Sequence, residues 1–511
     1  MSLDEYALVA SVQGVICLEL QFHKTNIPCL KQVCRAVQNR EQTQEVKLPD
    51  ALPDVGRVLG AWGQPLLRGK QWQTGGMTIS AGVMVWVLYA PEDGSEARCV
   101  QSWIPFQMNW DFPDTERDGV MQAQCLLKEV DARSVSARKI LVRAELSVLG
   151  EAMEEAEMPL YAPGDIPEDV QLLRRSYPVL LPREAGEKAF ALDEELSLPA
   201  SQPGMEKLIR FQMRPELIDQ KVMSGKVVFR GEANLHILYR TPEGTLKTWD
   251  FSLPFSQYAD LNRDYDQEAR AQVALAVTNL ELEQWEDRLR LKAGLVGQYQ
   301  IREQTVLEVV QDAFSNRRAV DLQVQEVEFP AILEQRRELL RAEGTVHEDG
   351  VTFVDTSLLL EQPRVRRNVE TVELVVPGVL QGYSYDQNGA PRWDNVRWEG
   401  KLELPVGTEC QLCVQAIPTG AVQPIGNDMQ ADIALELTTM AQQGLPMVAA
   451  LELGDAREPD PARPSLILRR AGENGLWDMA KSCGSTVEAI RHANGLEGEP
   501  VQGQLLLIPV S

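Results

Sequence analysis

The segments VMVWVLYAPEDG (residues 83–94) and ANLHILYRTPEG (residues 233–244) indicate a repeated β architecture, because the second repeats the first at a displacement of 150 residues. In the first segment, valines alternate with other large apolar residues, which is typical of a strand buried on both faces. The second segment alternates Leu235 and Ile237 with Asn234 and His236 before the same Leu-Tyr pair. Both segments end in a Pro-Glu turn that contains a glycine, so the sequence predicts two equivalent β-hairpins.

The repeat extends on both sides of these hairpins. A Leu-Pro pair with a second proline four residues later precedes each hairpin, and an apolar-Pro-Phe motif follows it. The residues are Leu48, Pro49, Pro53, Ile104, Pro105 and Phe106 in the first copy, and Leu198, Pro199, Pro203, Leu253, Pro254 and Phe255 in the second. We interpret the Pro-x-x-x-Pro segment as a turn followed by one short helix.

A third, more divergent copy follows. Its motifs are Phe329-Pro330, Gly382-Tyr383, Asn388-Gly389 and Leu404-Pro405. The distance from Pro330 to Tyr383 is 53 residues, whereas Pro49 and Tyr89 are 40 residues apart. We therefore expect an insertion in this copy, around Glu361 to Glu373.

The chain has 511 residues, which is enough for three or four domains. Because period-two alternation predominates, we predict a mainly β protein with three tandem β-sandwich-like repeats followed by a small βααβ domain. The predicted ranges are 1–155 for the first repeat with an N-terminal strand region, 185–305 for the second, 318–442 for the third, 455–464 for a proline-rich linker, and 465–511 for the terminal domain.

The βααβ prediction comes from spacing. An apolar strand over residues 466–468 precedes two short helices, and a closing strand covers residues 505–509. Each helix carries one apolar stripe for a two-stranded sheet: Leu476, Met479 and Ala480 in the first, and Val487, Ile490 and Ala493 in the second. Ser485 or Thr486 can cap the second helix, and Gly495 is typical of its end.

These residues resemble the LysM family through the motifs LWDMAK, STVEAI, ANGL and GQLLLIP. The resemblance implies binding to N-acetylglucosamine polymers in a shallow groove between two loops. The candidate binding residues in these loops are Glu473, Asn474, Gly475, Asn494 and Leu496. The family usually carries Gly-Asp-Thr or Gly-Asp-Ser where this chain has residues 473–475, so a hydroxyl that would cap the helix and could face a sugar is missing. We expect Trp477 to pack in the domain core.

The three longer copies resemble the SPOCS domain of spore-forming Firmicutes. The motifs that carry this resemblance are the Leu-Pro strand end, the Leu-Tyr strand before a Pro-Glu-Gly turn, and the following Leu-Pro-Phe. Tandem SPOCS domains ending in a LysM are similar to coat-morphogenesis proteins that dock onto the morphogenetic ATPase coating the developing spore. The resemblance implies a place in the mother-cell cytoplasm, at the forespore surface, with this ATPase or other coat proteins as partners.

Composition excludes some partners. Acidic residues outnumber basic ones by 75 to 50, and the net charge of −25 repels nucleic acid. The acidic N-terminus and the lack of a run of about 18 apolar residues predict neither export nor membrane insertion. The eight cysteines are scattered, so we expect them to be reduced.

Motifs for catalysis are missing from the sequence. The four histidines lie in different regions, and neither a zinc-binding His pair, an esterase elbow nor a phosphate-binding loop occurs. We interpret His236 as a structural residue of a buried strand, and Cys410 and Cys413 as part of a strand. We therefore expect no enzyme, no cofactor and no metal.

Three hypotheses for the function follow. The first is a non-catalytic scaffold in spore-coat assembly that docks onto a coat morphogenetic ATPase through its LysM and SPOCS domains. The second is a protein that binds peptidoglycan or another N-acetylglucosamine polymer through the LysM groove. The third is an enzyme whose site lies unrecognised in a β domain.

Overall fold

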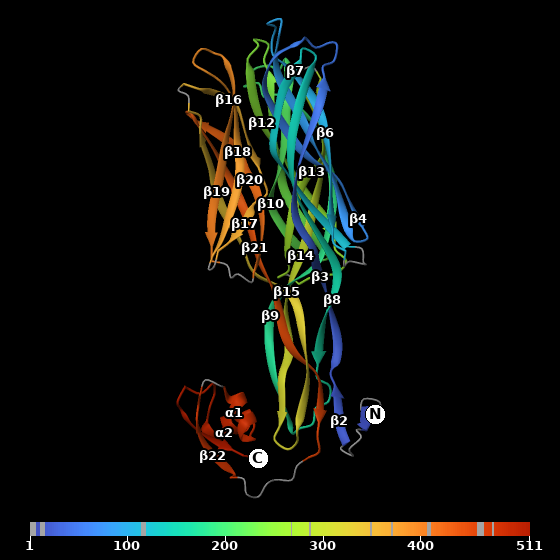
Figure 1. Ribbon diagram of the computed structural model, residues 1–511, viewed down its shortest axis with the longest axis vertical. Coiled ribbons are helices and arrows are strands. Elements are labelled where there is room, and N and C mark those ends of the chain that lie inside the picture. The colour runs from blue at the N-terminus through green and yellow to red at the C-terminus, as the bar shows by residue number, and fades with distance from the viewer. Residues whose placement is uncertain are drawn as a thin grey trace.

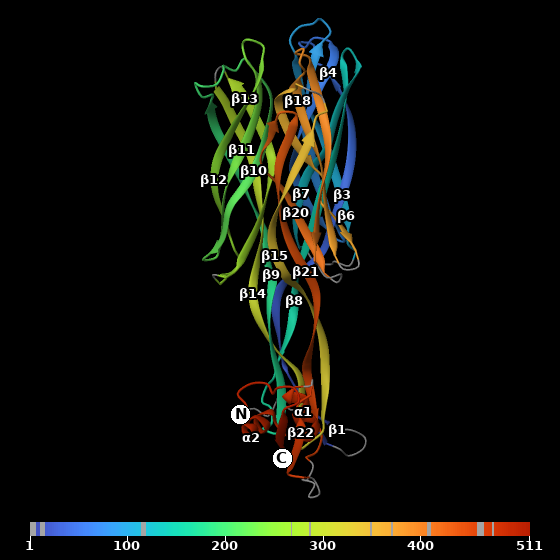
Figure 2. The same cartoon turned by 90° about the vertical axis from the view of Figure 1, so that its left-hand side faces the viewer.

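The structure, a computed structural model, describes residues 7–10, 16–113, 119–266, 268–285, 288–347, 350–368, 371–405, 410–456, 464–472 and 475–510. It is mainly β, as predicted, and the helices in the described residues are two short ones near the C-terminus. Figures 1 and 2 show an elongated molecule with a broad head of packed sheets above a narrow stalk of long strands.

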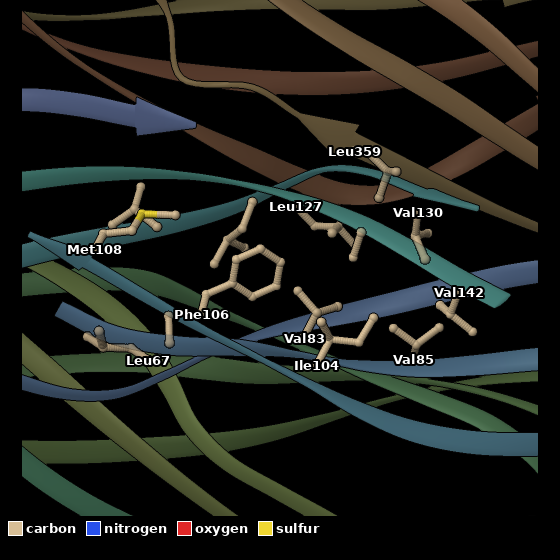
Figure 3. Packing of buried hydrophobic residues seen from close by; sticks show 14 of the residues in the cluster. Leu67, Val83, Val85, Ile104, Phe106, Met108, Leu127, Val130, Val142 and Leu359 are labelled. Atoms are coloured by element: carbon tan, nitrogen blue, oxygen red, sulfur yellow. The ribbon is translucent and has the colours of Figure 1, made fainter. Parts of the chain in front are cut away.

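The first unit, residues 23–162, contains two antiparallel three-stranded sheets. One has the order β3 (His23–Lys47), β8 (Lys139–Ala162) and β7 (Gly119–Ser136), and the other has the order β4 (Val55–Gln73), β5 (Gly76–Pro91) and β6 (Arg98–Asp111). Apolar side chains of both sheets form one buried core, in which Val85 of β5 lies near Val142 of β8, and Val83 of β5 lies beside Ile104 of β6 (Figure 3).

The second unit, residues 170–315, repeats this arrangement. Its sheets have the orders β13 (Arg270–Trp285), β14 (Arg288–Ser315), β9 (Val170–Ser197) and β10 (Lys207–Met223), β11 (Lys226–Arg240), β12 (Leu246–Asp260). Leu235, Ile237 and Tyr239 of β11 belong to its core.

The third unit, residues 320–453, has the same order of strands with one strand divided. In one sheet β21 (Asp428–Leu453) pairs with β15 (Val320–Thr345) and β20 (Gln411–Ile425), and also with β2 (Ile16–Gln21), whose other neighbour is β1 (Ala7–Ala10). In the other, β18 (Val372–Tyr385) pairs with β19 (Pro391–Leu404), β16 (Thr352–Leu360) and β17 (Arg364–Arg367).

Two tyrosine hydrogen bonds show how closely the first two units repeat. The Tyr89 hydroxyl donates to the carbonyl oxygen of Pro53 at 3.0 Å, and the Tyr239 hydroxyl donates to that of Pro203 at 3.1 Å. Both residues of the second pair lie 150 positions after those of the first. The repeated Tyr and Pro residues therefore fix the same contact between the hairpin and the loop before β4 or β10.

The segment between the two prolines forms a turn without the expected helix. The Leu52 amide donates to the Pro49 carbonyl at 3.0 Å, and the Gln202 amide donates to Pro199 at 2.9 Å. The next residue in each copy is a second proline, Pro53 or Pro203, which has no N–H with which to continue a helical pattern. The prolines therefore limit this segment to a turn.

The match of Phe329-Pro330 to the Leu-Pro motif was wrong. Phe329 lies within β15, where it pairs with Gln443. The residue that follows β15 is Val346, and it is the counterpart of Leu48. The Val346 amide donates to the Asn427 carbonyl at 2.9 Å, just as the Leu48 amide donates to the Arg138 carbonyl at 3.0 Å. Counted from Val346, the glycine of the hairpin, Gly389, comes 43 residues later, whereas Gly94 follows Leu48 by 46. The third unit is thus shorter here. The segment around Glu361 to Glu373 is not an insertion, because it contains β17, which pairs with β18 next to the stretch of β18 that pairs with β16.

Tyr383 is not the counterpart of Tyr89. The amide of the turn glycine Gly389 donates a hydrogen bond to the carbonyl of Asp386, and Asp386 follows Tyr383 by three residues. The amide of Gly94 donates to the carbonyl of Pro91, which follows Tyr89 by only two residues. A shift of one residue turns a strand side chain to the opposite face. Tyr383 accordingly lies in a cluster between the units, with Trp62, Leu88 and Leu238.

The packing between units explains why β5 is apolar on both faces. Val83 and Val85 belong to the core of the first unit, whereas Trp86 on the other face packs against Phe211 of the second unit with ring centroids 5.0 Å apart. Leu88 joins Leu238 and Tyr383 in the cluster between the units. The outer faces of the β4, β10 and β16 sheets are therefore buried by one another.

Six strands are far longer than an ordinary strand of five or six residues. The strands β3, β8, β9, β14, β15 and β21 contain 24 to 28 residues each. They pair as β3 with β8, β9 with β14, and β15 with β21, and they continue below the head as the stalk (Figures 1 and 2). Their lower ends share a separate core that includes Met158, Leu307, Phe329 and Met447.

Glutamine side chains connect the units above the stalk. The Gln298 side chain of β14 accepts from the Ala123 amide and donates to the Ala123 carbonyl of β7, both at 2.8 Å. Gln64 accepts from the Met213 amide at 3.0 Å, and Gln124 donates to the Ala416 carbonyl at 3.3 Å. These bonds satisfy buried backbone groups across unit boundaries and so fix the relative positions of the units.

Candidate interaction surfaces

The terminal unit has the predicted βααβ order. Strands β22 (Leu466–Arg470) and β23 (Leu505–Pro509) pair antiparallel, and α1 (Leu476–Cys483) and α2 (Val487–Asn494) lie between them in the chain. The predicted helical stripes contribute Leu476, Met479, Ala480 and Ile490 to a core that Leu506 and Ile508 complete. Thr486 caps α2 by accepting from the Ala489 amide at 3.0 Å.

The predicted binding residues of the first loop are only partly described. Glu473 and Asn474 lie outside the described residues. Gly475 is the N-cap residue of α1, and it forms no side-chain cap hydrogen bond. This position therefore lacks the cap that a hydroxyl residue would supply.

The predicted residues of the second loop hold that loop in place. The Asn494 amide group donates to the carbonyls of Ile490 and Leu507 at 2.8 and 2.6 Å, and its oxygen accepts from the Leu507 amide at 2.8 Å. Leu496 is half-buried and packs against the core of the terminal unit. Asn494 thus ties α2 to β23, and its replacement would disturb the fold as well as any ligand contact.

Trp477 lies at the edge of the core, where the terminal unit meets the stalk. Its ring meets that of Phe314 edge to face, with centroids 4.8 Å apart and planes at 70°. Its indole N–H donates to the Asp312 carboxylate at 2.7 Å. The expected packing role is therefore shared with a contact to β14, and neither Asp312 nor Phe314 was identified from the sequence, because they are 165 and 163 residues away.

Lys481 completes this contact. Its ammonium group lies 2.8 Å from each oxygen of the Asp312 carboxylate. Lys481 follows Trp477 by one helical turn, so both side chains lie on the same face of α1. We call Trp477 and Lys481 the reading face, and residues 312–314 of β14 the docking segment.

A buried ionic network lies where the second and third units meet. Arg210 of β10 donates from Nε and Nη2 to the two oxygens of Asp355 of β16, at 2.8 and 2.7 Å. Both residues are buried, with 1% and 2% of their surface exposed. His236 lies between two carboxylates, with Nε2 2.8 Å from Asp355 and Nδ1 2.6 Å from Asp250. His236 lies within β11, as the alternation of the sequence predicts, whereas its carboxylate partners were not predicted.

The charge states of this network follow from its geometry. Burial lowers the pKa of His236, but hydrogen bonds to Asp250 and Asp355 outweigh it, and the pKa is raised overall. Burial also opposes the ionised form of Asp355, yet Arg210 and His236 hold its pKa below the usual range. The Trp62 ring of the first unit lies 5.0 Å from the Arg210 guanidinium, so all three units contact this network.

A cavity of about 530 Å³ lies between the three units, and His236 and Asp250 of the network are part of its lining. Its charged lining comes from Arg214, Glu216, Glu232, His236 and Asp250 of the second unit and from Arg337 and Glu436 of the third. Burial lowers the pKa of Arg214 and raises that of Glu436. Within the part of the chain that the structure describes, no group of three or more His, Cys, Asp and Glu side chains is arranged to hold a metal ion.

Cys413 lies in β20, as the strand interpretation of the Cys-x-x-Cys pair predicts, and Cys410 directly precedes that strand. Burial raises the pKa of the Cys413 thiol. No described helix is long and apolar enough to cross a membrane.

Comparison with known families matches the second unit. A family model described as SipL, SPOCS domain matches residues 205–284, which run from the loop before β10 to the end of β13. This range contains the Leu-Tyr, Pro-Glu-Gly and Leu-Pro-Phe motifs of the second copy and strands of both its sheets. The predicted SPOCS resemblance is confirmed for this unit. No curated protein and no solved structure matches the chain.

Proposed function

We propose that this chain is a non-catalytic scaffold of spore-envelope assembly, which docks onto a coat morphogenetic ATPase or another coat protein. The SPOCS match in the second unit supports a sporulation-related role in protein interaction. The internal repeat extends this support to the first unit, because both share the Tyr-to-Pro contact. The LysM resemblance of the terminal unit and a place at the forespore surface, in the mother cell, belong to this proposal.

The observation that carries the proposal is the chemistry of the reading face. Trp477 and Lys481 bind the carboxylate and the aromatic ring of a protein strand. Aromatic residues with a polar edge are common where one protein binds another, since they combine apolar area with a hydrogen-bond donor. A terminal unit that holds a protein strand in this way is suited to protein docking.

The test is co-purification from sporulating cells that produce the tagged chain. Removal of residues 465–511 is expected to abolish capture of the coat ATPase, and Lys481→Glu is expected to reduce it strongly because the charge is reversed on the reading face. Lys139→Glu serves as the matched control, since Lys139 and Lys481 have similarly exposed side chains, 41% and 43%.

Capture that survives removal of the terminal unit would contradict docking through that unit. The glycan hypothesis is tested with the same variants on purified peptidoglycan. Retention by the intact chain that is lost with residues 465–511 but unaffected by Lys481→Glu would favour glycan binding over the scaffold. Asn494→Ala is avoided, because Asn494 holds β23.

A further inference from the structure

The docking segment presents two chemically distinct side chains that a protein surface can recognise. Asp312 follows a register shift between Val310 and Asp312 in the pairing of β14 with β9, and such a bulge re-aims the side chains beside it. Asp312 and Phe314 are two residues apart and so lie on the same face of the strand. Ala313 between them points into the stalk core. The segment therefore presents a carboxylate and an aromatic ring side by side.

The reading face matches this pair group by group. Lys481 neutralises the Asp312 carboxylate, and the Trp477 N–H adds a third hydrogen bond to it. Phe314 is only 5% exposed, because it joins the apolar core of the terminal unit. Figures 1 and 2 both place α1 beside the lower end of the stalk. Charge, hydrogen bonding and apolar contact thus all fall on residues 312–314.

We propose that the reading face recognises an extended segment with an acidic residue followed two positions later by an aromatic one, and that residues 312–314 are an internal occupant competing with such a segment in the partner. The inference rests on the proposed function, since it names the chemistry of the partner that the terminal unit binds. A chain with its reading face occupied by β14 is closed, and one with that face free is open.

The linker of residues 455–464 makes the contact between the reading face and the docking segment effective, although the contact is small. A linker of about ten residues holds the terminal unit near the stalk at an effective concentration in the millimolar range. A weak contact then suffices to keep most molecules closed. If closed molecules outnumber open ones by about ten to one, the affinity for the partner falls about tenfold. Salt weakens the closed state because the Lys481 ion pair is partly exposed.

The closed state is measured by zero-length carbodiimide crosslinking of the full chain, followed by mass spectrometry of tryptic peptides. Lys481 and Asp312 are 2.8 Å apart and are expected to form an amide crosslink. Lys139 and Glu45, also 2.8 Å apart, provide the control pair within the first unit. The inference is overturned if the control pair crosslinks and Lys481 with Asp312 does not.

Competition is measured with a synthetic peptide of the sequence EVVQDAFSNRR, residues 308–318. This peptide in millimolar excess is expected to lower the yield of the Lys481–Asp312 crosslink and to leave that of Lys139–Glu45 unchanged. The same peptide with asparagine at position 312, or with alanine at position 314, is expected to have no effect. Equal effects of all three peptides would show that the surface does not select the acidic and aromatic pair.

The partner experiment separates this inference from the proposed function. Asp312→Asn opens the chain without altering the terminal unit, and it is expected to raise capture of the coat ATPase by about three- to tenfold. Glu308→Gln, an exposed position on the same strand, is the control. Capture that depends on residues 465–511 but is unchanged by Asp312→Asn would overturn the competition and leave the scaffold in place. Crosslinking without any capture would contradict the scaffold instead.

Discussion

At the scale of single residues, the strongest constraint is the pairing of Arg210 with Asp355 across the second and third units. The pair is bidentate and almost inaccessible to solvent. A buried ion pair adds little net stability compared with an apolar pair, but loss of one partner leaves an uncompensated buried charge. We infer that this pair fixes the orientation of the two units.

Asp355→Asn is expected to destabilise the chain strongly, by about 3–5 kcal/mol, because it leaves Arg210 buried without its counter-charge. Asp219→Asn is the control, since Asp219 pairs with Arg230 on the surface, where screening by solvent leaves an ion pair little effect on stability. Differential scanning calorimetry is the measurement, and similar midpoints for the two variants would contradict the assigned role.

The same network predicts a pH dependence. The pKa of His236 is raised in the folded chain, so protonated His236 stabilises the folded state. This contribution to the free energy of unfolding is complete below the unfolded pKa of about 6.5 and is lost as pH rises through the folded pKa. The pKa of Asp355 is lowered in the folded chain, so ionised Asp355 stabilises the folded state. This contribution to the free energy of unfolding is complete above about pH 3.9 and is lost only as pH falls through the folded pKa. The network is therefore most stabilising between about pH 4 and 6.5.

A comparison of wild type with His236→Gln tests whether protonated His236 stabilises the folded state. The thermal midpoint of wild type is expected to exceed that of the variant at pH 6, and the difference is expected to shrink as pH rises to 9. A difference that stays constant or grows over this range would show that protonated His236 does not stabilise the fold.

At the scale of elements, strand packing leaves no room for side chains at certain glycines. A Cβ atom on Gly231, in the middle of β11, would lie 2.2 Å from the Glu216 carbonyl oxygen and 2.6 Å from the Phe255 ring. The backbone carbonyl cannot move without breaking the pairing of β10 with β11. The glycine therefore permits the central strand of this sheet to lie against its neighbours.

Gly231→Ala is expected to lower stability by about 1–3 kcal/mol through overpacking. Gly69→Ala is the control, because Gly69 is also in a strand and a Cβ there meets no atom within 4 Å. The two variants are compared by thermal unfolding. Equal midpoints would mean that β11 can shift to accept the methyl group.

At the scale of the whole molecule, the three units behave as one body because buried polar groups of one are satisfied by another. Gln298 of the second unit forms with Ala123 of the first the two hydrogen bonds that a neighbouring strand would otherwise supply. Lys70 of the first unit also donates to Gln298, at 2.7 Å. Separation of the units would leave these groups without partners.

Gln298→Leu is expected to loosen the boundary between the first two units. It leaves the amide and the carbonyl of Ala123 without partners, at a cost of about 1–3 kcal/mol for each group. Hydrogen exchange is expected to rise at residues 121–125 of β7. Unchanged exchange at these amides would show that the side chain is replaceable by water.

Much of the fold follows from local patterns. The turn glycines, the Leu-Tyr strands and the helical stripes of the terminal unit are local signals, and they predicted the hairpins, the repeat of the first two units and the βααβ order. The third unit was misaligned because Phe329-Pro330 has the same local pattern as the true motif while lying inside a long strand. The stalk was missed because continuation of a strand depends on its partner.

Local sequence patterns account for the mainly β class, the repeat of the first two units and the elements of the terminal unit, because periodicity and turn residues act over a few positions. Contacts between distant parts of the chain depend on the tertiary structure: which outer faces meet, that His236 contacts Asp355, and which strand the reading face binds. Asp312 and Trp477 are 165 residues apart, and neither residue type carries information about the other. Their contact arises only when β14 and α1 are folded and tethered close enough for one carboxylate to accept from both side chains.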